Sequence, residues 1–176
     1  RRDHLTGLFN KPMFLDTLAL AGSRLERTGR MLAVLYIDLD GFKPVNDRFG
    51  HDAGDRMLVE IADRLRRAVR ASDVVARLGG DEFGAILENL RHAGDARKVA
   101  RHIVEQVAAP LEVEGTAIVI SASIGAVVID RMVGDGAGLL QQADWQMYRA
   151  KTAGRGQVSV ATAAARDAGR DAAPGG

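Results

Sequence analysis

Residues 77–87 read RLGGDEFGAIL, two adjacent glycines and two adjacent acids set between apolar segments. The flanking runs 74–78 and 82–88 have the composition of β-strands, and the glycines let the chain turn between them. We therefore predict a β-hairpin at this position. One polar residue is enough for a hairpin turn, so the paired carboxylates of Asp81 and Glu82 require a further explanation.

Working outward from this hairpin, helical and strand patterns alternate irregularly. Residues 31–38, MLAVLYID, are almost entirely apolar, which is typical of a strand buried on both faces of a sheet. The order of elements predicts an α/β (α+β) fold, a mixed sheet with helices packed on it. The other expected elements are helices over about 12–27, in a segment ending near 69, and over 94–108 and 139–151, with strands near 111, at 116–129 and at 157–160.

Composition and charge exclude several classes of protein. The 176 residues are 47% hydrophobic and 27% charged, which is ordinary for a globular chain long enough to bury a core. Lys and Arg total 24 against 23 acids, a net charge of +1, so no polybasic surface for nucleic acid or membrane is indicated. The chain has no cysteine, which excludes disulfides, thiolate catalysis and zinc–thiolate sites. Its longest apolar runs are too short or too polar to span a bilayer.

The apolar pattern stops before the end of the chain. We expect one folded domain over residues 1–160 and a disordered tail or linker over 161–176, because ATAAARDAGRDAAPGG has no large apolar residue to bury. The chain begins with Arg1 instead of Met and shows no signal peptide, so we expect it to be part of a longer protein.

Acidic residues gather at two places that a sheet can bring together. Asp38 and Asp40 end the apolar strand, and Asp81 and Glu82 occupy the hairpin bend. If the hairpin lies beside that strand, the carboxylates meet at one edge of the sheet, where their repulsion favours a bound cation. Mg²⁺ is the natural candidate, since one or two carboxylates and substrate phosphates hold it. Turns are also acidic because water solvates them; the adjacent glycines favour a ligand, because glycine lets a backbone approach one closely.

Six blocks of the sequence together form a recognisable pattern. They are, in order, DHLTGLFN at 3–10, DLDGFKPVND at 38–47, GHDAGD at 50–55, ARLGGDEF at 76–83, SASIGAV at 121–127 and ADWQMYRAKTAGR at 143–155. These blocks resemble the GGDEF domain, the family of diguanylate cyclases that make cyclic di-GMP from GTP, and the resemblance covers about residues 3–160. It implies a central, mostly antiparallel five-stranded mixed sheet flanked by helices and carrying the signature hairpin, similar to the palm folds of nucleotidyl cyclases and polymerases.

By this resemblance the acidic edge is a metal-dependent active site. Asp38, Asp81 and Glu82 would ligate Mg²⁺ or Mn²⁺, two ions per active site, and the carbonyl of Leu39 would complete the protein's share. The ribose 3′-hydroxyl of one GTP would attack the α-phosphate of another and expel pyrophosphate, with the metal neutralising the developing charge. Asp81 or Glu82 would accept the proton, and the sequence does not decide between them. Lys43 would act beside them as a phosphate contact.

The same resemblance assigns the contacts to the guanine base. Asn46 and Asp55 match the family's guanine readers, and a carboxylate can accept from guanine N1–H and its exocyclic amine together. From the residues alone, Asn46 or Asp47 could cap a helix and Asp55 could be a helix-start acid. We favour the guanine role for Asn46 and Asp55 and the cap for Asp47. The adjacent glycines of the substrate site are Gly79 and Gly80.

The other substrate contacts lie in two further blocks. Lys151 and Arg155 match phosphate contacts and are four residues apart near a helix end, so both can face one polyanion. His51 matches a substrate-contacting position, although a histidine beside glycines is as often structural. Phe42 could wall the base pocket or belong to the core, and we favour the core.

A possible inhibitory site precedes the hairpin. Arg70-Ala-Ser-Asp73 has the form RxxD, with five residues between it and Gly79. In the family this arrangement marks a site that binds the product, and the arginine fork matches the O6 and N7 acceptors of guanine. Alternatively, Arg70 is simply a cation favoured at a helix C-terminus. Arg101 could join the site.

The resemblance also implies partners. Each protomer would hold one GTP, so catalysis needs a homodimer, with cyclic di-GMP as product and inhibitor; no nucleic acid and no direct membrane contact are expected. GTP chemistry places the domain in the cytoplasm, also if it is the cytoplasmic part of a membrane-bound protein. The alternatives are a non-catalytic module that binds GTP or cyclic di-GMP, against which the intact signature argues, and another nucleotidyl cyclase or palm polymerase, against which Asn46 and Asp55 argue.

Overall fold

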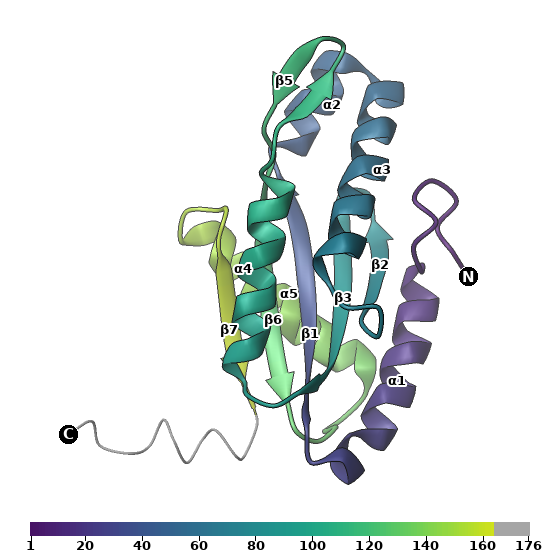
Figure 1. Ribbon diagram of the computed structural model, residues 1–176, viewed down its shortest axis with the longest axis vertical. Helices are drawn as coiled ribbons and strands as arrows, with labels where there is room; N and C mark the ends of the chain where they lie inside the picture. The colour runs from purple at the N-terminus through teal and green to yellow at the C-terminus, as the bar shows by residue number, and fades with distance from the viewer. Residues whose placement is uncertain (164–176) are drawn as a thin grey trace, which may run out of the picture.

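A five-stranded mixed sheet forms the centre of the molecule. In the computed structural model, which describes residues 1–163, the strand order is β2-β3-β1-β6-β7 (Figure 1). All neighbours pair antiparallel except β6 and β7, which are parallel. The expected mixed, mostly antiparallel sheet is therefore confirmed. The strands are β1 (Met31–Asp40), β2 (Val74–Gly79), β3 (Glu82–Leu90), β6 (Ser121–Ile129) and β7 (Val158–Thr162).

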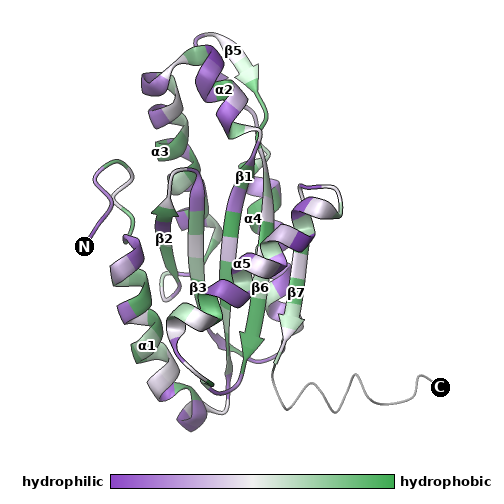
Figure 2. Cartoon of the chain, turned by 180° about the vertical axis from the view of Figure 1, so that it is seen from behind, coloured by the Kyte–Doolittle hydropathy of each residue, from purple (hydrophilic) through white to green (hydrophobic). Residues whose placement is uncertain are grey.

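Helices cover both faces of this sheet. α1 (Lys11–Thr28) and α5 (Gly136–Thr152) pack on one face, and α3 (His51–Ala68) and α4 (Gly94–Val107) on the other (Figures 1 and 2). Along β1, alternate apolar side chains enter the two cores, because successive residues of a strand point to opposite faces. This double burial explains the nearly continuous apolar sequence of β1.

The segment after β1 forms two helices where the sequence predicted one. α2 (Phe42–Phe49) ends at Gly50, and α3 begins at the next residue. Gly50 has φ +91°, a conformation that favours glycine, and its N–H donates to the carbonyl of Asn46 at 2.8 Å. Asn46 and Asp47 both lie within α2, and no side chain caps the N-terminus of α2 or of α3. The prediction that Asp47 caps a helix is therefore wrong.

A small hairpin replaces the first part of the expected 116–129 strand. β4 (Leu111–Val113) pairs with β5 (Thr116–Ile118) in a separate two-stranded sheet, and β6 begins only at Ser121. Figure 1 shows this hairpin beyond the end of the main sheet, beside α2.

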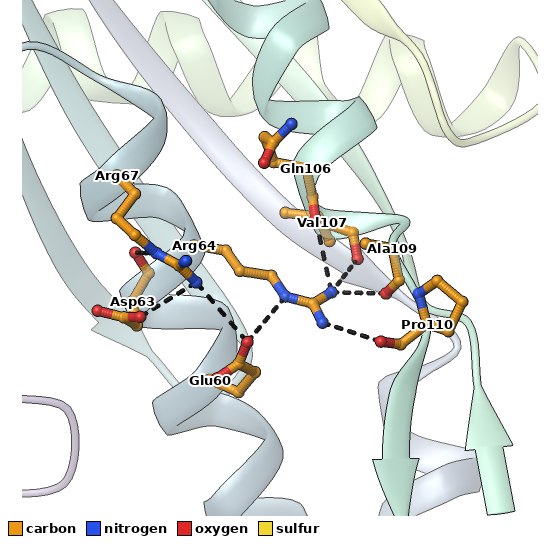
Figure 3. Close-up of polar contacts among 8 residues, drawn as sticks. All are labelled: Glu60, Asp63, Arg64, Arg67, Gln106, Val107, Ala109 and Pro110. Atoms are coloured by element: carbon orange, nitrogen blue, oxygen red, sulfur yellow. Dashed lines mark hydrogen bonds and ion pairs between the residues drawn. The ribbon is translucent and has the colours of Figure 1, made fainter.

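Arg64 of α3 holds the start of this hairpin. Its guanidinium donates to the carbonyls of Val107 at 3.1 Å, Ala109 at 2.6 Å and Pro110 at 3.0 Å, where α4 ends and the chain enters β4 (Figure 3). These carbonyls lie at and just beyond the C-terminus of α4, where a helix leaves carbonyls without partners of its own, so one cation satisfies several of them. The contact fixes the hairpin against α3.

The N-terminal turn covers the free edge of β2. Phe9 forms a parallel bridge with Ala76, and the N–H of Arg77 donates to the Phe9 carbonyl at 2.9 Å. Asp3 anchors the turn, accepting from Thr6 N and Oγ1 at 2.8 and 2.7 Å and pairing with Arg77 at 3.2 Å. Burial alone would raise the pKa of Asp3, but these hydrogen bonds and the arginine charge lower it.

β7 continues to Thr162, two residues beyond the expected domain boundary at 160, and most of the expected 161–176 tail lies outside the described residues. None of the helices within residues 1–163 is both long and apolar enough to cross a bilayer.

Candidate active site

The tip of the β2–β3 hairpin lies beside the end of β1. Asp38 is the register partner of Glu82, and the N–H of Leu39 donates to the carbonyl of Asp81 at 3.3 Å. The antiparallel pairing of β1 with β3 thus brings together the acids that the sequence placed at two strand ends. Gly79 and Gly80 form the bend, and within the described part of the chain no atom beyond their adjacent residues lies within 4 Å of where a Cβ would sit, so there is room beside them for a ligand.

Asp38 is a part-buried carboxylate among like charges. Its Oδ2 is 2.7 Å from the ammonium of Lys151, which reaches it from the end of α5. Burial is the main cause that raises the pKa of Asp38, and the charges of Asp81 and Glu82 raise it further, while Lys151 partly offsets both. The ionised form of Asp38 is therefore under-stabilised and favours an additional cation.

Glu82 is held from the side of α1 and α5. The hydroxyl of Tyr36, two residues before Asp38 and so on the same face of β1, donates to Glu82 Oε2 at 2.6 Å. Burial first, and then this carboxylate, raise the pKa of the Tyr36 hydroxyl, which keeps its proton. Asp144 of α5 also has a raised pKa, caused by burial and the charge of Glu82, with Lys11 opposing.

The donor set suits a hard divalent cation. Carboxylate and carbonyl oxygens are the ligands Mg²⁺ and Mn²⁺ prefer, and burial first, then the charges of Asp81 and Glu82, raise the pKa of Asp38, so a cation there would favour its ionised form. Within residues 1–163 no three histidine or acidic side chains already converge in a metal-binding group, and Lys151 neutralises Asp38 instead. The residues fit such an ion by their chemistry, without a preformed cage.

The expected guanine-reading residues lie at the junction of α2 and α3. Asn46 Nδ2 is 3.5 Å from Nδ1 of His51, and a Cβ on Gly54 would lie 1.8 Å from Asn46 Oδ1. Gly54 therefore allows the two helices to touch, which sets Asn46 next to the turn of α3 that carries Asp55. Asp55 is exposed in the second turn and is not one of the first-turn acids of α3.

The remaining residues predicted to contact the substrate differ in burial and position. Phe42 is buried with the α3 and α4 core, as favoured. Lys43 is exposed in the first turn of α2. Lys151 lies in the last turn of α5, and Arg155 follows the end of the helix, exposed and with φ +60°. The structure thus places Lys151 at the acids, while no contact in the described chain joins Lys43 to them.

The RxxD motif forms a closed turn between α3 and β2. Asp73, whose side chain is 1% exposed, accepts from the backbone N–H groups of Arg70 at 3.0 Å and Glu88 at 3.2 Å. The Arg70 guanidinium donates to the Glu88 carbonyl at 2.8 Å and remains more than half exposed. Arg101 lies exposed on α4 and, within the described residues, is hydrogen-bonded to neither.

Sequence reasoning missed two parts of this site. Asp40 was grouped with the acidic cluster, yet its carboxylate is occupied by Ser121, Ser123 and the N–H of Gly156. Tyr36 had no assigned role. The available signals were the spacing of Tyr36 to Asp38 on one strand face and the two serines of SASIG, which only the sheet register connects to Asp40.

The sequence matches a known protein family. Residues 1–157 match the family described as diguanylate cyclase, GGDEF domain. The chain belongs to the GGDEF family. Over 156 residues this GGDEF domain is 44% identical to the bifunctional diguanylate cyclase/cyclic di-GMP phosphodiesterase MucR of Pseudomonas aeruginosa, covering 87% of this chain and 22% of MucR. It is 42% identical over 160 residues to diguanylate cyclase TpbB of the same organism, covering 90% of this chain and 37% of TpbB. It therefore spans well under half of these relatives.

Solved GGDEF structures share the fold. A TpbB structure from P. aeruginosa comprising only the GGDEF domain has a TM-score of 0.87 and 41% identity, covering 92% of this chain and 94% of that one. The GGDEF domain of DgcB from Caulobacter crescentus, in complex with c-di-GMP, has a TM-score of 0.82 and 28% identity, covering 90% and 94%.

Proposed function

We propose that this GGDEF domain is a diguanylate cyclase that condenses two GTP molecules into cyclic di-GMP and two pyrophosphates. The observation that carries the proposal is the edge where Asp38 faces Glu82 and Leu39 is bonded to Asp81. The intact signature and 42% identity to diguanylate cyclase TpbB support the same reaction.

The acidic edge would hold the metal. Asp38, Asp81 and Glu82, with the Leu39 carbonyl, would bind Mg²⁺ or Mn²⁺, two ions per active site. When bound, the ions would neutralise charge on the phosphates and lower the pKa of the attacking hydroxyl. The protein's own contribution is to bring these carboxylates together at one edge of the sheet and to place Lys151 beside Asp38.

The substrate would lie across the end of β1. Asn46 and Asp55 would read the guanine edge, with His51 nearby, while Lys151, Arg155 and Lys43 would contact the phosphates. Gly79 and Gly80 leave room for the nucleotide at the hairpin. Oriented in this way, the α-phosphate faces the 3′-hydroxyl of a second GTP, and Asp81 or Glu82 would accept that hydroxyl's proton.

The reaction would require two copies of the domain. One protomer binds one GTP, so the attacking hydroxyl comes from the GTP of a facing protomer in a homodimer. GTP chemistry would place the domain on the cytoplasmic side of the cell. A catalytically weak module that binds GTP or cyclic di-GMP is the second candidate, favoured by the Lys151–Asp38 ion pair, which must open before Asp38 can bind metal.

One assay separates the two candidates. The protein is incubated with GTP and Mg²⁺ over a range of protein concentrations, and the nucleotides are separated by chromatography. A cyclase gives cyclic di-GMP and pyrophosphate, at a rate that rises more steeply than protein concentration if dimerisation limits it. Unchanged GTP at every concentration, with nucleotide binding retained, would establish the binding module.

Product inhibition at the RxxD turn is part of the proposal and has its own test. Arg70→Ala removes the exposed guanidinium, and we expect the inhibition constant for cyclic di-GMP to rise about tenfold, as for one lost charge-assisted contact. Rates are compared before and after product addition, so that each variant serves as its own reference. Arg67→Ala, an exposed arginine one turn earlier that pairs with Asp63, is the control. Equal inhibition of both variants would remove the inhibitory site from this turn.

A further inference from the structure

Asp40 joins three segments of the chain at the edge of the active site. Its carboxylate is buried at the end of β1, and the residue is 8% exposed. It accepts from Ser121 Oγ at 2.7 Å and from Ser123 Oγ at 2.9 and 3.0 Å, both on β6. It also accepts from the N–H of Gly156 at 3.1 Å, in the loop between α5 and β7. One carboxylate therefore ties β1, β6 and this loop together.

The loop that Asp40 holds has an unusual backbone. Gly154, Arg155 and Gly156 have φ values of +130°, +60° and +60°. The left-handed region is unfavourable for a residue with a Cβ, so Arg155 keeps this conformation only if the surrounding contacts impose it. The N–H of Arg155 donates to the Ala150 carbonyl at 3.1 Å, and the next N–H donates to Asp40. The Gly156 N–H also lies 3.2 Å from Ser123 Oγ, which itself donates to Asp40, so the Asp40–Ser123 pair on β1 and β6 holds this loop to the sheet.

The same carboxylate lies beside Lys151. The Lys151 ammonium is 2.7 Å from Asp38 Oδ2 and 3.6 Å from Asp40 Oδ1. The two acids differ in what else they contact: three hydrogen-bond donors engage Asp40, whereas within residues 1–163 the Lys151 ammonium is the one cation or donor beside the Asp38 carboxylate. If Asp38 turns to another cation, Asp40 is the carboxylate that still holds Lys151 at the site.

We propose that Asp40 is a positioning residue for polyphosphate binding. It fixes the Lys151 ammonium and the backbone of the Arg155 loop, so that both cations face one triphosphate or pyrophosphate group together. The inference rests on the proposed function only in naming GTP as the source of that polyphosphate. An ammonium and a loop backbone that one buried acid already holds lose little freedom when the anion binds, which favours affinity.

Asp40→Asn tests the proposal with nearly unchanged side-chain shape. We expect affinity for pyrophosphate with Mg²⁺, measured by calorimetry, to fall about tenfold, the size of a lost charge-assisted contact. Amide hydrogen exchange across residues 153–157 should become faster. If the protein turns over GTP, KM should rise more than kcat falls, because phosphate contacts act in the ground state as well. Asp47→Asn, an exposed acid on α2, is the matched control and should change none of these quantities.

A double-mutant cycle separates positioning from general stability. In a Lys151→Met background, Asp40→Asn should weaken pyrophosphate binding by much less than tenfold, because Lys151 no longer needs to be held. An equal loss of pyrophosphate affinity in both backgrounds would overturn the proposal. So would pyrophosphate affinity and amide exchange in Asp40→Asn that match wild type.

If Asp40→Asn does not fold, Ser121→Ala serves as the second variant. Faster amide exchange in the loop and a smaller loss of pyrophosphate affinity would support the proposal, and no change in either quantity would contradict it. If the wild-type protein does not convert GTP, the proposed cyclase reaction is refuted but the positioning role of Asp40 is not, because pyrophosphate affinity and amide exchange are measured without turnover.

Discussion

Asp3 and Asp38 are carboxylates of similar exposure, each paired with a cation, yet their pKa values shift in opposite directions. Their side chains are 20% and 14% exposed. Asp3 accepts two hydrogen bonds from Thr6 and pairs with Arg77, which together lower its pKa despite burial. The pKa of Asp38 is raised by burial and by neighbouring acids, and Lys151 only partly offsets these effects.

The difference shows how this chain separates structural from functional charge. The N-terminal turn surrounds its acid with enough donors to satisfy it, so the charge stabilises the fold. The end of β1 and the hairpin concentrate acids, and the Lys151 ammonium only partly offsets the effects that raise the pKa of Asp38, so the charge there costs stability until a cation binds. Functional sites commonly carry such a cost. The following experiments test whether the two acids differ in this way.

The largest effect is expected for Asp81→Ala, at the acidic edge. We expect activity below about a hundredth of wild type, since even residues that only support metal ligands cost about 10–100-fold. Cyclic di-GMP formation is the measurement, with Asp47→Ala as an exposed acidic control. Turnover that survives in Asp81→Ala would contradict the assignment of the metal site.

Asp3→Asn should affect stability and not the chemistry. Loss of its hydrogen bonds and its charge should lower the free energy of unfolding by about 2 kcal/mol at pH 7. Because the folded-state pKa of Asp3 is lowered, its stabilisation is full above the unfolded pKa near 3.8 and disappears as the pH falls through the folded value. Urea unfolding at pH 7 and pH 3, followed by the single Trp145, should therefore show the difference from wild type narrowing in acid.

Asp38→Asn in the same urea experiment sharpens the comparison. The folded-state pKa of Asp38 is raised, so its ionised form opposes folding above that pKa and the penalty vanishes below 3.8. The metal-free variant should be at least as stable as wild type at pH 7 and lose this advantage in acid. A destabilisation like that of Asp3→Asn would show that Asp38 is a structural acid.

Tyr36→Phe is expected to have the smallest effect of the series. It removes only the hydroxyl that donates to Glu82, and kcat/KM should fall about tenfold, since a hydrogen bond to a charged group contributes about 1.5–3 kcal/mol. Tyr148→Phe, an exposed tyrosine on α5, is the control. Equal kinetics in wild type and both variants would mean that Glu82 needs no support from this side.

The sheet could be predicted from the sequence where its patterns are unambiguous. The hairpin was expected at 74–78 and 82–88 and is found at Val74–Gly79 and Glu82–Leu90. The prediction of one strand over 116–129 was wrong, because the apolar residues continue through Val119–Ile120, where the chain leaves β5 before entering β6. Periodicity alone does not mark this break. The boundary between α2 and α3 was missed because it depends on the backbone conformation of Gly50 alone.

The site was predictable only as far as the strands determine it. Acids at the ends of paired strands must meet, so their proximity follows from the hairpin. The Lys151–Asp38 pair depends on how closely α5 approaches the sheet, which Gly125 permits: a Cβ there would lie 2.0 Å from the backbone nitrogen of Met147. The occupation of Asp40 by two β6 serines likewise depends on the β1–β6 register, which no local pattern encodes.

Metal binding tests the central claim most directly. Mn²⁺ is titrated by calorimetry into wild type and Asp38→Asn in the presence of a GTP analogue that cannot react at its α-phosphate. We predict at least about tenfold weaker binding of Mn²⁺ to Asp38→Asn, as expected when a charged ligand is removed. Equal Mn²⁺ affinity in the two proteins would contradict the claim that the end of β1 and the β2–β3 hairpin form a cation site.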